Sequence, residues 1–238
     1  AGSDGAKGDV LTCEERHLNN LLVKDDTPMQ QVTMDGQEVF KFAVRMVPKS
    51  ITKVLDNCAK TFKSAGDVKA QFVATQFEGR DEIGSSRGTI SISGKKLFID
   101  NGGVKIWYDG KTQWSLVSDN KEVNITEPSP QERSQMNPYS FLSIYKNGYS
   151  ATMTSETVRN ESCYCVNLVS TKSKNYMQTI LLTISKSTML PICIRTKTSP
   201  NKWTRISIYD FEKRQRFKDD MFRFDSADYP GVEIVDLR

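Results

Sequence analysis

The feature of this sequence that most constrains its fold is a series of short segments, from Asp67 onward, in which apolar and polar residues alternate. In Gly88–Gly94, Ile90 and Ile92 fall on one face and the intervening serines and threonine on the other, as in a half-buried strand. The same pattern recurs at 96–99, 162–170, 176–185, 192–198 and 204–211. Many short strands joined by polar connections are typical of a β-barrel or a β-sandwich. The sequence therefore predicts a mainly β fold.

Local signals add a hairpin and two helices to this pattern. Residues 104–117 predict a hairpin, because Asp109-Gly110 favours a two-residue type I′ turn between two runs of aromatic and β-branched residues. A strand-like run follows at 121–126. Helical spacing of apolar residues predicts helices over Ile51–Ser64 and Asn137–Lys146. Both are short enough to need a sheet to lie on.

Composition excludes several classes of protein. The chain has 238 residues, 37% of them hydrophobic and 26% charged, which is enough apolar content for a sizeable core. Its formal net charge is only +4, and the basic residues are interspersed with acidic ones, so a nucleic-acid-binding surface is not expected. No apolar run is long enough for a transmembrane helix. The first nine residues, AGSDGAKGD, lack the apolar region of a signal peptide.

The residues that usually carry catalysis or bind metals form no convincing constellation. Cys163 and Cys165 are two residues apart on a predicted strand, so they share a face and cannot readily bond each other. Cys193 is expected two strands away, too far for a bridge. The single histidine, His17, is remote in sequence, and no Gly-x-Ser-x-Gly motif occurs. We therefore expect no enzymatic activity, no metal site and no cofactor.

Four segments, in order, resemble LolA-type outer-membrane lipoprotein carriers over about residues 54–238. They are VLDNCAKTFKSAGDVKAQF, WYDGKTQW, EVNITEPSPQERSQMNPYSFLSIYKNGY and FRFDSADYPGVEIVDLR. The resemblance implies an unclosed, strongly bent antiparallel β-barrel, or half-barrel, with short helices over its mouth. It also implies an apolar cavity for the acyl chains of lipoproteins.

Under this resemblance, candidate lipid-binding residues fall into a lid and a lining. The lid would be formed by Phe141, Leu142, Ile144 and Tyr145. The lining would be formed by Ile90, Ile92, Phe98, Ile106, Trp114, Leu116, Leu182, Ile184, Ile206 and Ile208. The alternation alone leaves open that these residues simply fill a core, because a cavity wall and a core use the same pattern.

The chain departs from the family pattern at one position. Family members often carry an Arg-Pro pair before the strand that corresponds to Leu97–Ile99, and that arginine holds the lid closed. Here the sequence is Gly94-Lys95-Lys96. Lysine lacks the planar fork of arginine, so Lys95 or Lys96 would have to replace the latch in another geometry.

Residues 1–50 resemble a different protein, an internal piece of β-ketoacyl-acyl-carrier-protein synthase III. The segment MDGQEVFKFAVR carries this resemblance most specifically. The catalytic motifs of that enzyme lie outside the matching piece, so no catalytic role passes to Cys13 or His17. We interpret residues 1–50 as a fused, misassembled or engineered N-terminal segment, and residues 51–238 as the carrier domain.

The resemblance implies a periplasmic carrier, a monomer that receives acylated lipoproteins from an inner-membrane release complex and passes them to an outer-membrane acceptor. Two alternatives stay open. One is a lipid-sensing or structural domain of the same fold, and the other, less supported, is a remnant of an acyl-transfer synthase.

Overall fold

The computed structural model describes residues 11–12, 33–34, 36–129, 132–133, 146, 148–172 and 177–238, with side chains from residue 49 onward. The chain divides into two compact units, Ala1–Lys53 and Val54–Arg238. In the first unit, the short strands β1 (Leu11–Thr12) and β2 (Thr33–Met34) pair antiparallel. The boundary between the units falls inside the helix α1 (Gly36–Ser64). No helix among the described residues is both long and apolar enough to cross a membrane.

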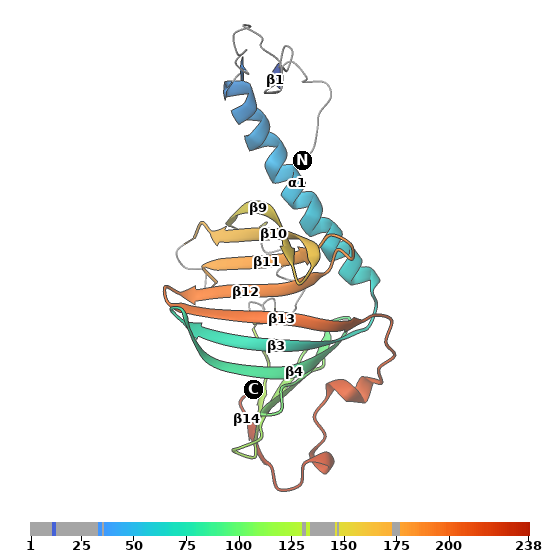
Figure 1. Cartoon of the computed structure of the whole chain (residues 1–238). Helices are drawn as coiled ribbons and strands as arrows, with labels where there is room; N and C mark the ends of the chain where they lie inside the picture. The colour runs from blue at the N-terminus through green and yellow to red at the C-terminus, as the bar shows by residue number, and fades with distance from the viewer. Residues whose placement is uncertain are drawn as a thin grey trace, which may run out of the picture. The chain divides into compact units, whose positions relative to one another are not determined.

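The second unit is built around one 12-stranded sheet (Figure 1). Its strands are β3 (Val68–Glu78), β4 (Asp81–Ser93), β5 (Lys96–Asp100), β6 (Val104–Tyr108), β7 (Gln113–Val117), β8 (Glu122–Thr126), β9 (Tyr149–Val158), β10 (Glu161–Ser170), β11 (Thr179–Ser185), β12 (Pro191–Ser199), β13 (Lys202–Glu212) and β14 (Glu233–Asp236). Two short 3-10 helices, η4 (Asp219–Phe222) and η5 (Ser226–Asp228), precede β14.

The sheet consists of two antiparallel meanders joined through strands that are distant in sequence. The spatial order is β14-β8-β7-β6-β5-β4-β3-β13-β12-β11-β10-β9. β13 pairs with β3 at its centre, and β14 adds to β8 as a parallel edge strand. Figure 1 shows the sheet bending strongly, with β5–β8 turning away from the broad surface of β9–β13 and β3. This mainly β, unclosed sheet confirms the predicted fold class.

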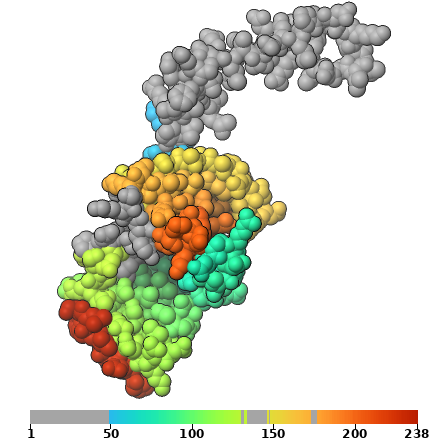
Figure 2. Space-filling model, turned by 90° about the vertical axis from the view of Figure 1, so that its left-hand side faces the viewer, coloured from blue at the N-terminus to red at the C-terminus, as the bar shows by residue number. Residues whose placement is uncertain are grey.

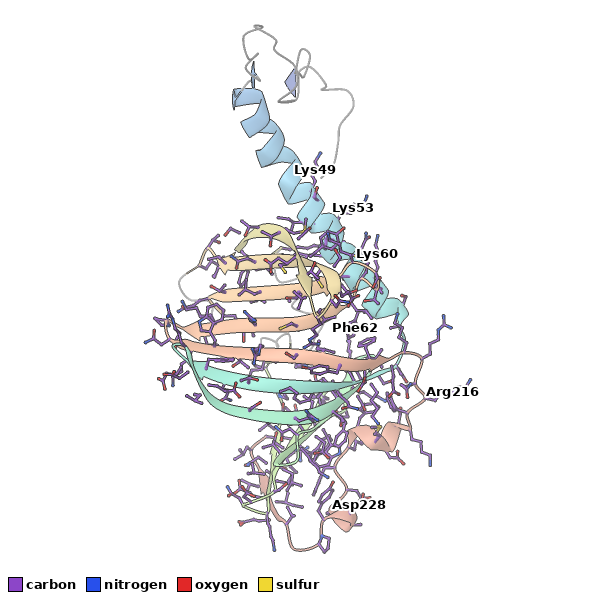
Figure 3. All side chains as sticks on the ribbon, in the orientation of Figure 1. Lys49, Lys53, Lys60, Phe62, Arg216 and Asp228 are labelled. Atoms are coloured by element: carbon purple, nitrogen blue, oxygen red, sulfur yellow. The ribbon has the colours of Figure 1, made fainter. Side chains whose placement is uncertain are left out.

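The C-terminal part of α1 buries one stripe of side chains. Val54, Leu55, Cys58 and Phe62 are at most 8% exposed, while Lys60 is exposed. The Phe62 ring makes an edge contact with Phe211 of β13, with centroids 5.4 Å apart (Figure 3). The helix ends at Ser64, and Gly66 follows with a φ of +70°, a conformation that glycine adopts freely. Apolar spacing therefore predicted this end of the helix correctly.

The start of the helix was predicted wrongly. We expected it at Ile51, whereas α1 begins at Gly36. Residues 37–47 contain neither glycine nor proline to stop a helix, and α1 also continues through Pro48, a residue that disfavours a helix interior, to join the predicted segment. The second predicted helix, Asn137–Lys146, lies outside the described residues except for Lys146.

The hairpin of β6 and β7 exists, but its turn differs from the predicted one. Tyr108 pairs with Gln113, so the loop contains residues 109–112 rather than two residues. The Asp109 carboxylate accepts hydrogen bonds from the backbone N–H groups of Lys111 (3.0 Å) and Thr112 (2.9 Å). Because this side chain captures two backbone donors, the loop is wider than a type I′ turn.

Candidate functional site

The strand register assigns the side chains of the sheet to two faces. Cross-strand partners share a face, so Leu182, Ile194 and Ile206, which are consecutive partners across β11, β12 and β13, lie on the same side. We call this side the isoleucine face. Following the register through β3, β4 and β5 places Ile90, Ile99 and Ile106 on it as well. The other side is called the opposite face.

Burial is uneven along the isoleucine face. Over β10 and β11 the side chains of Val166, Leu168, Ile180, Leu182 and Ile184 are at most 1% exposed. In contrast, several large apolar residues towards the centre of the sheet are only half-buried. These residues, which we call the half-buried apolar strip, are Phe72, Ile90, Ile99, Ile106, Ile206 and Ile208.

The members of the strip are neighbours across strands. Ile90, Ile99 and Ile106 are successive partners on β4, β5 and β6. Ile208 on β13 pairs with Phe72 on β3. The six side chains contain only carbon and hydrogen beyond the backbone, so the strip offers dispersion contacts and apolar area but no group that could perform chemistry. Such a surface suits an alkyl chain.

Of the residues predicted to line a lipid cavity, seven share the isoleucine face. They are Ile90, Ile92, Ile106, Leu182, Ile184, Ile206 and Ile208. Among them, Ile92, Leu182 and Ile184 are fully buried, whereas the other four belong to the half-buried apolar strip. The predicted lid residues Phe141, Leu142, Ile144 and Tyr145 lie outside the described residues.

Three of the predicted lining residues lie on the opposite face instead. Phe98, Trp114 and Leu116 pack in a cluster around Trp107, together with Phe224, Tyr229 and Val232 of the C-terminal segment. The ring of Trp107 lies 5.3 Å from that of Phe98 and 5.6 Å from those of Phe224 and Tyr229, centroid to centroid. Figure 2 shows the C-terminal end of the chain lying against residues 100–125. Leu116 is therefore buried, and Phe98 and Trp114 are partly buried, in a cluster that the C-terminal segment completes.

Lys95 and Lys96, the two lysines that could replace the family's latch arginine, lie in different surroundings from each other. Lys96 forms an ion pair of 2.9 Å with Asp219 of η4. It alternates with Leu97, which is on the isoleucine face, so Lys96 points to the opposite face. Lys96 therefore helps to hold the C-terminal segment. Lys95 is exposed in the turn between β4 and β5.

Sequence reasoning missed two members of the strip, Phe72 and Ile99. Ile99 alternates with Leu97 in the segment KLFID, so its face could have been assigned from periodicity once Leu97 was placed inside. Phe72 belongs to VKAQFVATQFE, in which apolar residues occur on both faces. For Phe72, only the pairing with Gly88 and Ile208 identifies the face.

Burial raises the pKa of several cysteine thiols among the described residues. Burial raises the pKa of the Cys58 thiol to about 12, so this thiol stays protonated and is a poor nucleophile. Cys58, Cys163, Cys165 and Cys193 are all unbridged. Within the described part of the chain, no group of three or more His, Cys, Asp or Glu residues could hold a metal ion.

Part of the chain is similar in sequence to known β-ketoacyl-[acyl-carrier-protein] synthase III enzymes, as the N-terminal segment predicted. A β-ketoacyl-[acyl-carrier-protein] synthase III from Clostridium kluyveri is 46% identical over 54 residues, which are 23% of this chain and 17% of that enzyme. A similar protein from Clostridium novyi is 37% identical over 62 residues, 26% of this chain and 19% of that enzyme. The chain thus spans less than a fifth of the length of these enzymes.

The chain is also similar to solved structures. An uncharacterised conserved protein from Thermus thermophilus matches 79% of this chain and 99% of its own, at 8% identity and a TM-score of 0.53. A LolA superfamily protein from Nitrosomonas europaea matches 73% of this chain and 97% of its own, at 11% identity and a TM-score of 0.42.

The family model described as outer membrane lipoprotein carrier protein LolA matches residues 40–199. This range includes the C-terminal part of α1, the strands β3–β12 and most of the half-buried apolar strip. Because the match covers more than half of the chain, the protein belongs to the LolA family of outer membrane lipoprotein carriers.

Proposed function

We propose that this protein binds the acyl chains of lipoproteins along the half-buried apolar strip and carries them between membranes. The observation that supports this proposal is the incomplete burial of Phe72, Ile90, Ile99, Ile106, Ile206 and Ile208 on one face of the sheet. Residues that only filled a core would be expected to be as buried as Val166 or Ile180 on the same face. An alkyl chain could cover the apolar area that stays accessible on these six side chains.

The energetics of such a site favour tight binding. Each methylene group removed from water contributes about 0.8 kcal/mol, so a single long acyl chain could supply on the order of 10 kcal/mol before opposing terms. A carrier must also release its cargo. Its empty state therefore needs an alternative way of covering the strip, so that binding displaces existing contacts and the net affinity stays moderate.

The proposal includes where the carrier unit begins. We assign carrying to residues 51–238 and no part of it to residues 1–50. The division of the chain after Lys53 and the limited match of the synthase support this assignment. Family membership supports a periplasmic location, acylated lipoproteins as cargo, and exchange with an inner-membrane release complex and an outer-membrane acceptor.

Native mass spectrometry of the whole chain with a triacylated lipopeptide tests the proposal. We expect a one-to-one complex with wild type and weaker binding with Ile106→Asn, which places an amide at the β6 end of the strip. The matched control is Tyr209→Ser, because Tyr209 is 42% exposed and pairs with Gln71 on the opposite face. The control should bind like wild type.

Two results would contradict the proposal. One is the absence of any complex with wild type under conditions in which the protein is folded. The other is equal weakening by Ile106→Asn and Tyr209→Ser. Far-UV circular dichroism of each variant shows whether the β structure is retained, so a loss of binding can be separated from a loss of fold.

A further inference from the structure

The opposite face carries three neighbouring cations on β12 and β13. Arg195 is the direct cross-strand partner of Arg205, and Lys197 lies two residues further along β12. None of the three forms an ion pair with a carboxylate among the described residues. Like charges directly opposite each other destabilise a strand pair. This arrangement therefore costs stability, unlike the apolar pairing on the isoleucine face.

Aromatic rings hold two of these cations in place. The Arg205 guanidinium lies 4.9 Å from the centroid of the Phe77 ring, and the Lys197 ammonium lies 5.4 Å from that of Trp203. Phe77 and Trp203 are themselves cross-strand partners on β3 and β13. Stacking orients the cations while using none of their hydrogen-bond donors. Arg205 has one long hydrogen bond, 3.5 Å, to the Thr75 hydroxyl.

A cavity of about 310 Å³ opens among these groups. Its lining includes Phe77, Leu181, Arg195, Trp203, Thr204 and Arg205. Glu82, the cross-strand partner of Phe77, is not among the lining residues and forms no ion pair with the three cations. The cavity thus combines apolar walls with unpaired guanidinium groups, and its charge is complementary to an anion.

We infer that this cationic patch, formed by Arg195, Lys197 and Arg205 over Phe77 and Trp203, docks an acidic segment of a partner protein. Guanidinium groups bind carboxylates through two parallel hydrogen bonds, and the cavity can take a carboxylate side chain with its methylene groups against the rings. A membrane surface fits less well. Phe77 and Trp203 are half-buried and lie beneath cations, so they are not free to insert into lipid.

The position of the patch gives this docking a specific consequence. The cationic patch lies on the opposite face of β13 and β3, whereas Ile206, Ile208 and Phe72 lie on the isoleucine face of the same strands. A partner could therefore bind without occupying the half-buried apolar strip. The inference does not depend on lipid binding and can be tested separately from it.

Fluorescence anisotropy with a labelled peptide of alternating glutamate and serine tests the inference on the whole chain. We expect saturable binding to wild type that weakens as salt rises. The double variant Arg195→Gln/Arg205→Gln should weaken binding at least about tenfold, because it removes charged hydrogen bonds to the carboxylates. Lys213→Gln/Arg216→Gln is the charge-matched control, since both residues are exposed in the loop after β13, from which Arg216 projects (Figure 3). It should bind like wild type.

A second variant separates docking from folding. Arg195→Glu gives Arg205 a carboxylate partner across the strand pair, so its melting temperature should equal or exceed that of wild type. Its peptide binding should nevertheless be lost. Lack of peptide binding by wild type, or equal weakening by Lys213→Gln/Arg216→Gln, would overturn the inference. Binding only to vesicles that contain anionic phospholipid, dependent on Arg195 and Arg205, would also overturn it and identify a lipid surface as the occupant.

Discussion

The ring of Phe72 lies against Gly88, its partner across β3 and β4. A Cβ atom added to Gly88 would come within 2.8 Å of the Phe72 Cζ atom and 2.9 Å of the Asn101 Cα atom. The pairing of β4 with β5 begins at the next residue, Thr89. The missing side chain of Gly88 thus allows the end of β5 and an aromatic ring of the apolar strip to approach the same point of the backbone.

Gly88→Ala should therefore destabilise the protein by about 1–3 kcal/mol, because the backbone near Asn101 cannot move away easily. Urea unfolding followed by circular dichroism measures the change. Gly84→Ala is the matched control: Gly84 is on the same strand and has open space around its Cβ position. That substitution should be neutral or slightly stabilising. Similar destabilisation by both changes would contradict this account of Gly88.

Asp109 should make stability depend on pH in the acid range. Partial burial acts to raise its pKa, but the backbone N–H groups of Thr112 and Lys111 and the guanidinium of Arg223, 3.1 Å away, outweigh burial and lower it. A depressed carboxyl pKa stabilises the fold above the ordinary value of 3.8, and this contribution is lost as the pH falls through the folded-state pKa.

Asp109→Asn keeps an oxygen for the two backbone donors but removes the charge. We expect a loss of less than about 1 kcal/mol at neutral pH, because Arg223 is largely exposed. The difference from wild type should shrink as the pH falls below 3.8. Denaturant unfolding at several pH values measures it. A difference that grows as the pH falls would show that the charge of Asp109 is not responsible.

Cys58 should resist alkylation in the folded protein. It is fully buried in α1, and burial raises the pKa of its thiol to about 12, so very little thiolate exists near neutral pH. Treatment with iodoacetamide at about pH 8, followed by peptide mass spectrometry, should label Cys58 only after unfolding. Half-buried Cys165 provides the comparison within the same molecule and should react first. Rapid native labelling of Cys58 would indicate that this part of α1 opens readily.

Phe224→Ala should loosen the C-terminal segment from β5–β8. Phe224 contacts both Trp107 and Tyr229, so its loss removes two ring contacts from the cluster. We expect destabilisation of about 2–4 kcal/mol and a red shift in tryptophan fluorescence as water reaches Trp107. Tyr209→Ala, at an exposed ring on β13, should change neither property appreciably. An unchanged emission spectrum in Phe224→Ala would argue against this role of the segment.

The sequence was informative about strands because their alternation is local. The segments around Ile90, Leu182 and Ile206 all became strands, and their apolar residues share one face. Alternation cannot indicate what covers each face, and this limit explains the misplacement of Phe98, Trp114 and Leu116. On β5, apolar residues lie on both sides, since Leu97 faces one way and Phe98 the other; on β7, Trp114 and Leu116 alternate with polar Ser115, but this pattern does not indicate which face of the sheet they join.

The cover of the opposite face could not be predicted for a related reason. The segment that contains Phe224 and Tyr229 has no helical or strand periodicity, because it packs through 3-10 turns and single side chains. The cationic patch was equally hidden. Arg195 and Arg205 look like ordinary solvated strand residues until the register of β12 and β13 makes them partners.

The strand order also sets a sequence of events for the growing chain. β3–β8 and β9–β13 are each built from neighbours in sequence, and such hairpins form quickly. The pairing of β3 with β13, which joins the two meanders, cannot form as quickly, because its partners are far apart in sequence. Thr75 and Arg205, which are cross-strand partners, are 130 residues apart. Until β13 has been synthesised, β3 presents an unpaired edge next to an apolar surface. The partly synthesised protein is therefore the form most prone to aggregation. This risk lasts until β13 has been synthesised and has paired with β3.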